Sequence, residues 1–195
     1  MTCWVVIPVK GPDEGKQRLA AALDPARRTK LVRAMLERVV AAAQGARQVD
    51  EVCLLGSSRH GLPEGIPLLP DPGTGLNPAL TSAFVAAKQA EATRLVIVFA
   101  DLPQLTSLDI ELLVAAPEDE VAIAPDRHGT GTNAISLPLP AAEDFAFAFG
   151  PDSFALHSAE ARRLGLGIEE VRSRGLAHDI DEPDDLPDAG GLLGD

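Results

Sequence analysis

The sequence predicts a single α/β domain with a mostly parallel sheet flanked by helices, and two observations carry this prediction. Short apolar runs, such as CWVVIPV at 3–9 and RLVIVFA at 94–100, alternate with longer segments of helical periodicity. Runs that are apolar at every position are typical of strands buried on both faces. The length of 195 residues fits one domain, expected to span 1–195, with a loose tail over 189–195.

The individual elements follow in chain order from periodicity and from capping residues. Pro25 suits the first turn of a helix, and Asn77-Pro78 has the pattern of an N-cap followed by a proline at the first helical position. Thr106 or Ser107 is expected to cap a short helix. On this basis we expect strands at 3–9, 52–55, 94–100, 121–124, 133–137 and 168–171, and helices at 25–44, 77–91, 107–114 and 153–164.

Charge and composition exclude several classes of protein. The net charge of −12, from 17 basic and 29 acidic residues, repels nucleic acid and anionic membranes, so neither is an expected partner. No run approaches the roughly 18 apolar residues that span a bilayer. The apolar start lacks a preceding basic stretch and is interpreted as a first strand, not a signal peptide. With two cysteines, the expectation is a cytoplasmic protein; a homodimer would be unsurprising for a small α/β enzyme.

Ligands of open α/β sheets bind outside the carboxyl ends of the strands, which draws attention to the loops 10–18, 70–77 and 101–106. The segment from Gly11 to Lys16 is one residue short of a phosphate-binding P-loop, and Gln17 stands where that motif has Ser or Thr.

The first of these loops still has the composition of a phosphate site. Lys10, Lys16 and Arg18 cluster with Gly11 and Gly15, and this combination of cations and flexible backbone suits a triphosphate. A solvated turn with ordinary surface lysines would have the same composition, and both interpretations stay open on these residues.

Carboxylates at strand ends indicate a magnesium site. Asp101 directly follows a buried strand, a position that favours a hard-metal ligand over a carboxylate that caps the next turn. In Asp179-Ile180-Asp181, alternation along an extended segment places both carboxylates on one side. An acidic tail can also be plain solvated surface. Together, however, Asp101, Asp179 and Asp181 could hold one or two Mg²⁺ ions.

Two loops of small residues, 130–133 and 150–153, offer hydroxyls and backbone N–H groups. Ser153 stands at an expected helix N-terminus, where the helix dipole favours an anion. A second anion site and a plain turn with a plain helix cap are equally good interpretations of these residues. His157, on the expected helix, is interpreted as structural.

Six segments in this order resemble one known family: WVVIPVKGPDEGKQRLA, GLNPAL, FADLPQLT, APDRHGTGTNAI, FGPDSFALH and DIDEPDDL. They look like the CofC/FbiD guanylyltransferases of coenzyme F-420 biosynthesis, and the resemblance runs from Trp4 to about Leu186. It implies a Rossmann-like nucleotidyltransferase fold. It also implies transfer of GMP from GTP to the phosphate of a three-carbon acid, with Mg²⁺ as cofactor and diphosphate as product.

The resemblance also implies roles for individual residues. Asp101, Asp179 and Asp181 match the family's magnesium carboxylates, and Thr132, Gly150 and Ser153 match its phospho-acid site. The nucleotide is expected near Lys10, Gly11, Lys16, Arg18, Asn77 and Pro103, and Lys10, Lys16 and Asp101 are the expected catalytic residues.

Two alternatives remain beside this expectation. A molybdopterin-type or other nucleotidyltransferase on the same fold would favour a G-G pair in the first loop, whereas this chain has Val9-Lys10-Gly11-Pro12. A non-catalytic GTP-binding module would not depend on the three carboxylates. The sequence does not rank phosphoenolpyruvate, 2-phospho-L-lactate and 3-phosphoglycerate as the acceptor, and it does not identify the residues that read guanine.

Overall fold

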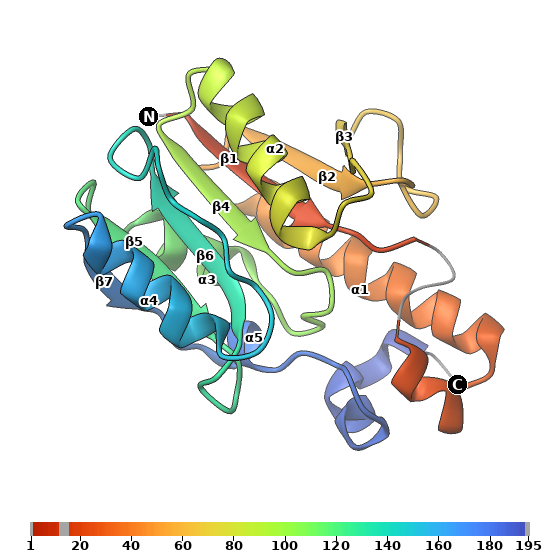
Figure 1. The fold of residues 1–195 in the computed structure, drawn as a ribbon. Helices are drawn as coiled ribbons and strands as arrows, with labels where there is room; N and C mark the ends of the chain where they lie inside the picture. The colour runs from red at the N-terminus through yellow and green to blue at the C-terminus, as the bar shows by residue number, and fades with distance from the viewer. Residues whose placement is uncertain (1, 12–15, 194–195) are drawn as a thin grey trace.

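Seven strands form one sheet in the order β3-β2-β1-β4-β6-β5-β7, with helices on both faces (Figure 1). The coordinates are a computed structural model that describes residues 2–11 and 16–193. The strands are β1 (Cys3–Pro8), β2 (Glu51–Gly56), β3 (Leu68–Pro70), β4 (Arg94–Val98), β5 (Glu120–Pro125), β6 (Thr132–Pro138) and β7 (Gly167–Glu170).

The sheet is mostly parallel, as the sequence predicts, and β6 is its one antiparallel strand within the described residues. β1 pairs in parallel with β2 and β4, whereas β6 runs antiparallel to both β4 and β5. Only residues 126–131 separate β5 from β6. That connection is too short for a parallel crossover, so it closes a hairpin. As a result β6 begins at the edge where the parallel strands end.

Two apolar clusters fill the spaces between the sheet and its helices. On one face β1 presents Val5 and Ile7 to α1 (Pro25–Gly45), α3 (Ser107–Val114) and the short α5 (Arg174–Ala177). On the other face Val6 and its neighbours pack against α2 (Leu76–Gln89) and α4 (Ser153–Arg163). Every side chain of β4 is buried, as expected for a strand covered on both faces.

The helix boundaries follow the expected pattern, with one exception. Asp24 caps α1 through the Arg27 amide, and Thr106 caps α3 in a capping box with Asp109. The prediction of Asn77 as an N-cap is wrong. α2 already begins at Leu76, and the side chain of Asn77 bonds to another segment of the chain.

Residues 189–193 of the expected loose tail have regular local structure, and residues 194–195 lie outside the described residues. Pro183–Leu193 forms a 3₁₀-helical segment, η2, broken at Gly190. Ala189 is 3% exposed and packs with Ile180 against Leu31 and Met35 of α1. A second 3₁₀ turn, η1 (Gln17–Ala21), joins the same cluster (Figure 1). Burial of these few apolar side chains orders the acidic segment through Leu193.

Among the described residues, no helix combines the length and the apolar character needed to cross a bilayer.

Candidate active site

A cleft of about 840 Å³ opens at the carboxyl edge of the sheet. The three loops expected at this edge each contribute to its lining, with Lys10, Asp71 and Asp101, and α1 adds Met35. Two further residues line the cleft: Asn133, near the start of β6, and Gly150, which lies just before α4. The antiparallel β6 thus contributes to the same edge as the parallel strands.

Three carboxylates meet in this cleft. Asp101, Asp179 and Asp181 each offer an oxygen, and these oxygens lie within 4.8 Å of one another. The Ile180 N–H donates to the Asp101 carbonyl at 3.1 Å, which fixes the Asp179–Asp181 segment beside the end of β4. Ile180 is completely buried. The alternation expected for an extended Asp-Ile-Asp segment therefore places both carboxylates toward the cleft.

The Lys16 ammonium sits between two of these carboxylates. Its Nζ lies 2.6 Å from Asp101 Oδ2 and 2.7 Å from Asp181 Oδ1, and the lysine side chain is only 10% exposed. Burial alone would lower the pKa of Lys16, but Asp101 and Asp181 outweigh it, so the pKa lies above its usual value. Lys16 is therefore charged at neutral pH and offsets part of the negative charge of the cluster.

Asp179 carries the charge that Lys16 does not neutralise. Burial raises the pKa of its carboxyl, and repulsion from Asp101 and then Asp181 raises it further. The amide Nδ2 of Asn133 lies 3.4 Å from Asp179 Oδ1, so it gives only weak compensation. The site thus contains a carboxylate whose ionised form would be stabilised by a further cation.

Replacing Asp179 with asparagine is expected to stabilise the metal-free protein at neutral pH. The pKa of Asp179 is raised in the folded state, so its ionised form costs stability above that pKa. This cost is relieved as the pH falls toward 3.8, the ordinary value for the group. Thermal unfolding in EDTA should show Asp179→Asn melting above the wild type at pH 7, with the difference shrinking on acidification. A wild type at least as stable at pH 7 would contradict this reading of the cluster.

Asp185 holds the Asp179–Asp181 segment in place, and sequence reasoning missed it. Its Oδ2 accepts from the N–H groups of Asp181 at 2.9 Å and of Glu182 at 2.8 Å, and its Oδ1 pairs with Arg127. Asp185 is 2% exposed, so it is a structural acid within an acidic run. Its spacing of four residues after Asp181 is the one sequence signal that could have identified it.

The residues expected near the nucleotide divide into two groups. Lys10, Gly11 and Lys16 line the cleft. Arg18 is 73% exposed and lies 3.5 Å from Glu182, and Pro103 is buried. Arg18 and Pro103 do not line the cleft, and Asn77 does not line it either. Gly15, the other glycine expected in the first loop, lies outside the described residues.

The three residues expected at the phospho-acid are brought close together. Gly150 lines the cleft, and its carbonyl accepts from the Ser153 N–H at 3.2 Å. Thr132 lies behind them, 4% exposed, with its Oγ1 3.0 Å from Nδ1 of His157. Ser153 is the first residue of α4, as predicted, and is 2% exposed. Of these three residues, Gly150 lines the cleft, whereas Thr132 and Ser153 are buried behind it.

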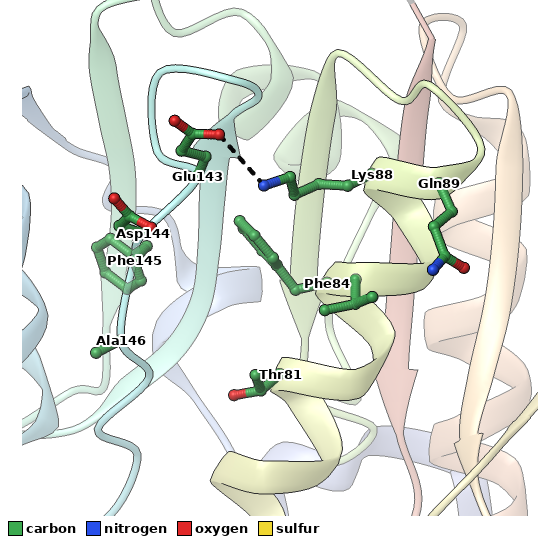
Figure 2. A pocket seen from close by; sticks show the side chains of 9 residues that line it. Thr81, Phe84, Lys88, Gln89, Glu143, Asp144, Phe145 and Ala146 are labelled. Atoms are coloured by element: carbon green, nitrogen blue, oxygen red, sulfur yellow. Dashed lines mark hydrogen bonds and ion pairs between the residues drawn. The ribbon is translucent and has the colours of Figure 1, made fainter.

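A second cavity, of about 630 Å³, lies between α2 and the chain that follows β6 (Figure 2). Lys88 reaches across it to Glu143, at 3.4 Å, and lies over the ring of Phe84 (Figure 2). None of the residues expected to bind or react lines this cavity. The cleft at the carboxyl edge is thus the candidate active site.

Comparisons with known proteins show which family the chain belongs to. The family profile described as "Guanylyl transferase CofC like" matches residues 3–189. A phosphoenolpyruvate guanylyltransferase from Sphaerobacter thermophilus is 45% identical over 196 residues, which cover 98% of this chain and 94% of the relative. A 2-phospho-L-lactate guanylyltransferase from Haloarcula marismortui is 37% identical over 182 residues, which cover 93% of this chain and 82% of the relative.

The fold also has solved counterparts. A nucleotidyl transferase from Methanothermobacter thermautotrophicus superposes with a TM-score of 0.69 at 17% identity, covering 98% of both chains. At this identity the likeness concerns the fold alone, and it matches the Rossmann-like nucleotidyltransferase fold expected from the sequence. The extent of the family match and the identity to the guanylyltransferases together show that the chain belongs to the CofC-like guanylyl transferase family and is a nucleotidyltransferase.

Proposed function

We propose that this protein transfers GMP from GTP to the phosphate of a three-carbon phospho-acid and releases diphosphate, as a step of coenzyme F-420 biosynthesis. The observation that carries the proposal is the cluster of Asp101, Asp179, Asp181 and Lys16 in the cleft, in a chain 45% identical to a phosphoenolpyruvate guanylyltransferase. The acceptors considered are phosphoenolpyruvate, 2-phospho-L-lactate and 3-phosphoglycerate.

Asp101, Asp179 and Asp181 fit a magnesium ion. Their three oxygens lie close enough to share one cation, and carboxylate oxygens are ligands that Mg²⁺ prefers. Burial and repulsion from Asp101 and Asp181 raise the pKa of Asp179, so a bound cation would favour its ionised form. When bound, Mg²⁺ would screen the two anionic substrates from each other and polarise the phosphoryl group that is transferred.

Lys10, Gly11 and Lys16 are proposed to hold the triphosphate of GTP. Lys10 and Lys16 bring positive charge to one wall of the cleft, and Gly11 adds backbone that a phosphate can approach closely. Binding of GTP would draw the Lys16 ammonium from Asp101 and Asp181 toward the phosphates, because the carboxylates and the phosphates compete for the same positive charge.

The phospho-acid is proposed to bind at Gly150, with Thr132 and Ser153 behind it. The N-terminus of α4 begins at Ser153, beside this corner, and the helix dipole there favours an anion. This corner and the Lys10 wall both line the cleft, so the two substrates can meet beside the carboxylates.

The reaction needs no protein nucleophile, because the acceptor phosphate is already an anion. One of its oxygens attacks the α-phosphorus of GTP in line, and the bond from that phosphorus to the oxygen bridging to the β-phosphate breaks. The products are a guanylylated acid with a new P–O–P linkage and diphosphate. Lys10 and Lys16 stabilise the charge that develops on the departing diphosphate.

Diphosphate release tests this function. The protein is given GTP and Mg²⁺ with each of the three phospho-acids in turn, and ATP and CTP replace GTP as controls. We expect release with GTP and one acid, and little with the other nucleotides. Tight GTP binding without release for any acid would refute the transferase proposal and favour a GTP-binding module.

A further inference from the structure

The segment Ala148–Gly150 reaches the cleft without belonging to a helix or a strand. It connects the chain after β6 to α4, and Gly150 at its end lines the cleft with a backbone φ of 132°. That φ suits glycine, because L side chains rarely adopt it. The Phe149 ring packs on Phe99 and Phe147, but the described residues form no ladder of backbone hydrogen bonds with this segment, so side chains that bond to its backbone help to set its position.

Asn77 provides the first of these anchors, from the first turn of α2. Its Oδ1 accepts from the Phe149 N–H at 2.8 Å, and its Nδ2 donates to the Phe149 carbonyl at 3.1 Å. The amide thus pairs with both backbone groups of one residue, as a neighbouring strand would. The polar atoms of Asn77 are directed at the backbone of Phe149.

His157 provides the second anchor, from α4. Its Nε2 lies 3.0 Å from the Ala148 nitrogen, whose N–H can only donate, so Nε2 accepts and carries no proton. The proton of the neutral ring then sits on Nδ1, which donates to Thr132 Oγ1 at 3.0 Å. Burial lowers the pKa of His157 to about 4, in agreement with a neutral ring at pH 7.

These contacts join the residues expected at the phospho-acid into one unit. His157 links Thr132 to Ala148, and the Ser153 N–H bonds to the Gly150 carbonyl. We infer that Asn77 and His157 are positioning residues that hold Ala148–Gly150 in the cleft for the phospho-acid, an inference that rests on the proposed function. Through this segment they set the affinity for the acid and leave the GTP phosphates, on the Lys10 wall, untouched.

The test separates the KM for the acid from the KM for GTP. Asn77→Ala removes both bonds to Phe149 and should raise the KM for the acid about tenfold, the scale of one to two hydrogen bonds, with the KM for GTP unchanged. Ser82→Ala is the matched control, because Ser82 is exposed on the same helix and its hydroxyl donates to the Pro78 carbonyl of that helix. It should leave both values unchanged.

His157→Asn extends the test to the second anchor. Asparagine can keep a donor near Thr132 but loses the acceptor for the Ala148 N–H. His157 is fully buried, so thermal unfolding checks that His157→Asn folds. If His157→Asn does not fold, Asn77→Ala alone tests the inference. In the double variant the two effects on the acid KM should combine to less than their product, because both act on one segment. Amide exchange at Phe149 should become faster in Asn77→Ala.

The outcomes distinguish this inference from the proposed function. A rise in the KM for GTP with the acid KM unchanged would overturn the inference and place Asn77 at the nucleotide. Faster exchange at Phe149 without any change in the acid KM would also overturn it, because the segment would then be held for stability alone. A wild type that transfers GMP to none of the three acids would refute the proposed function itself.

Discussion

Replacing Asp101 with asparagine is expected to lower the rate of guanylyl transfer at least ~100-fold, the scale of one well-placed electrostatic group in a transition state. The substitution keeps the shape of the side chain and removes its charge. It takes one carboxylate from the three that meet in the cleft, at the end of a strand whose position is fixed by its burial. Steady-state turnover with saturating GTP and Mg²⁺ measures the effect.

Asp184→Asn is the matched control for this change. Asp184 is an exposed acid three residues beyond Asp181, and it is not one of the three clustered carboxylates. Its loss changes the net charge by the same amount and should leave turnover near the wild-type rate. Near-normal turnover of Asp101→Asn, with an unchanged melting temperature, would remove Asp101 from the mechanism.

Replacing Lys16 with methionine is expected to have two separable effects. Turnover should fall about 100-fold, because the charge that stabilises the departing diphosphate is lost. The metal-free protein should also melt at a lower temperature, because Asp101 and Asp181 lose the cation that lies 2.6 and 2.7 Å from them. Methionine retains most of the buried aliphatic length, so the loss reports on the charge.

Mg²⁺ separates these two effects of Lys16→Met. Added metal should raise the melting temperature of the variant more than that of the wild type, because the uncompensated cluster gains more from a cation. Lys88→Met is the control, since Lys88 pairs with Glu143 at the second cavity and should affect neither turnover nor the response to Mg²⁺. A variant with wild-type turnover would show that Lys16 serves only as a counter-ion for Asp101 and Asp181.

Much of the fold could be predicted because its central strands contain runs of apolar residues, such as those in β1 and β4. The expected strand at 94–100 is the central β4. Of the two expected caps of α3, Thr106 and Ser107, the structure shows Thr106, in a capping box with Asp109. A local rule also predicted that Asp179 and Asp181 face one side, because an Asp-Ile-Asp segment turns its carboxylates away from a buried isoleucine. Their grouping with Asp101 came from the chemistry of magnesium ligands and from the resemblance to the guanylyltransferases.

The contributions that depend on tertiary contacts could not be predicted in the same way. Asn77 has the sequence pattern of an N-cap, yet its amide pairs with Phe149, 72 residues away, and the helix begins before it. His157 was interpreted as structural because a lone histidine on a helix carries no local signal. Its two partners, Thr132 and Ala148, come together only in the folded chain.

The order of the C-terminal segment has the same origin. Seven acidic residues from Asp179 to the end of the chain suggest a solvated tail. The structure instead buries Ile180 and Ala189 against α1, and it uses Asp185 to bind the backbone of Asp181. Two apolar side chains and one buried carboxylate hold this acidic segment against the rest of the fold.

The most direct test of guanylyl transfer is identification of the product by ³¹P nuclear magnetic resonance. The protein is incubated with GTP, Mg²⁺ and the acid that supports diphosphate release, and the same mixture with Asp101→Asn serves as the blank. Transfer predicts a pair of mutually coupled phosphorus signals from the new P–O–P linkage, which appear together with diphosphate. Formation of GMP or GDP without that coupled pair, or GTP left intact, would contradict the transfer of GMP to the phospho-acid.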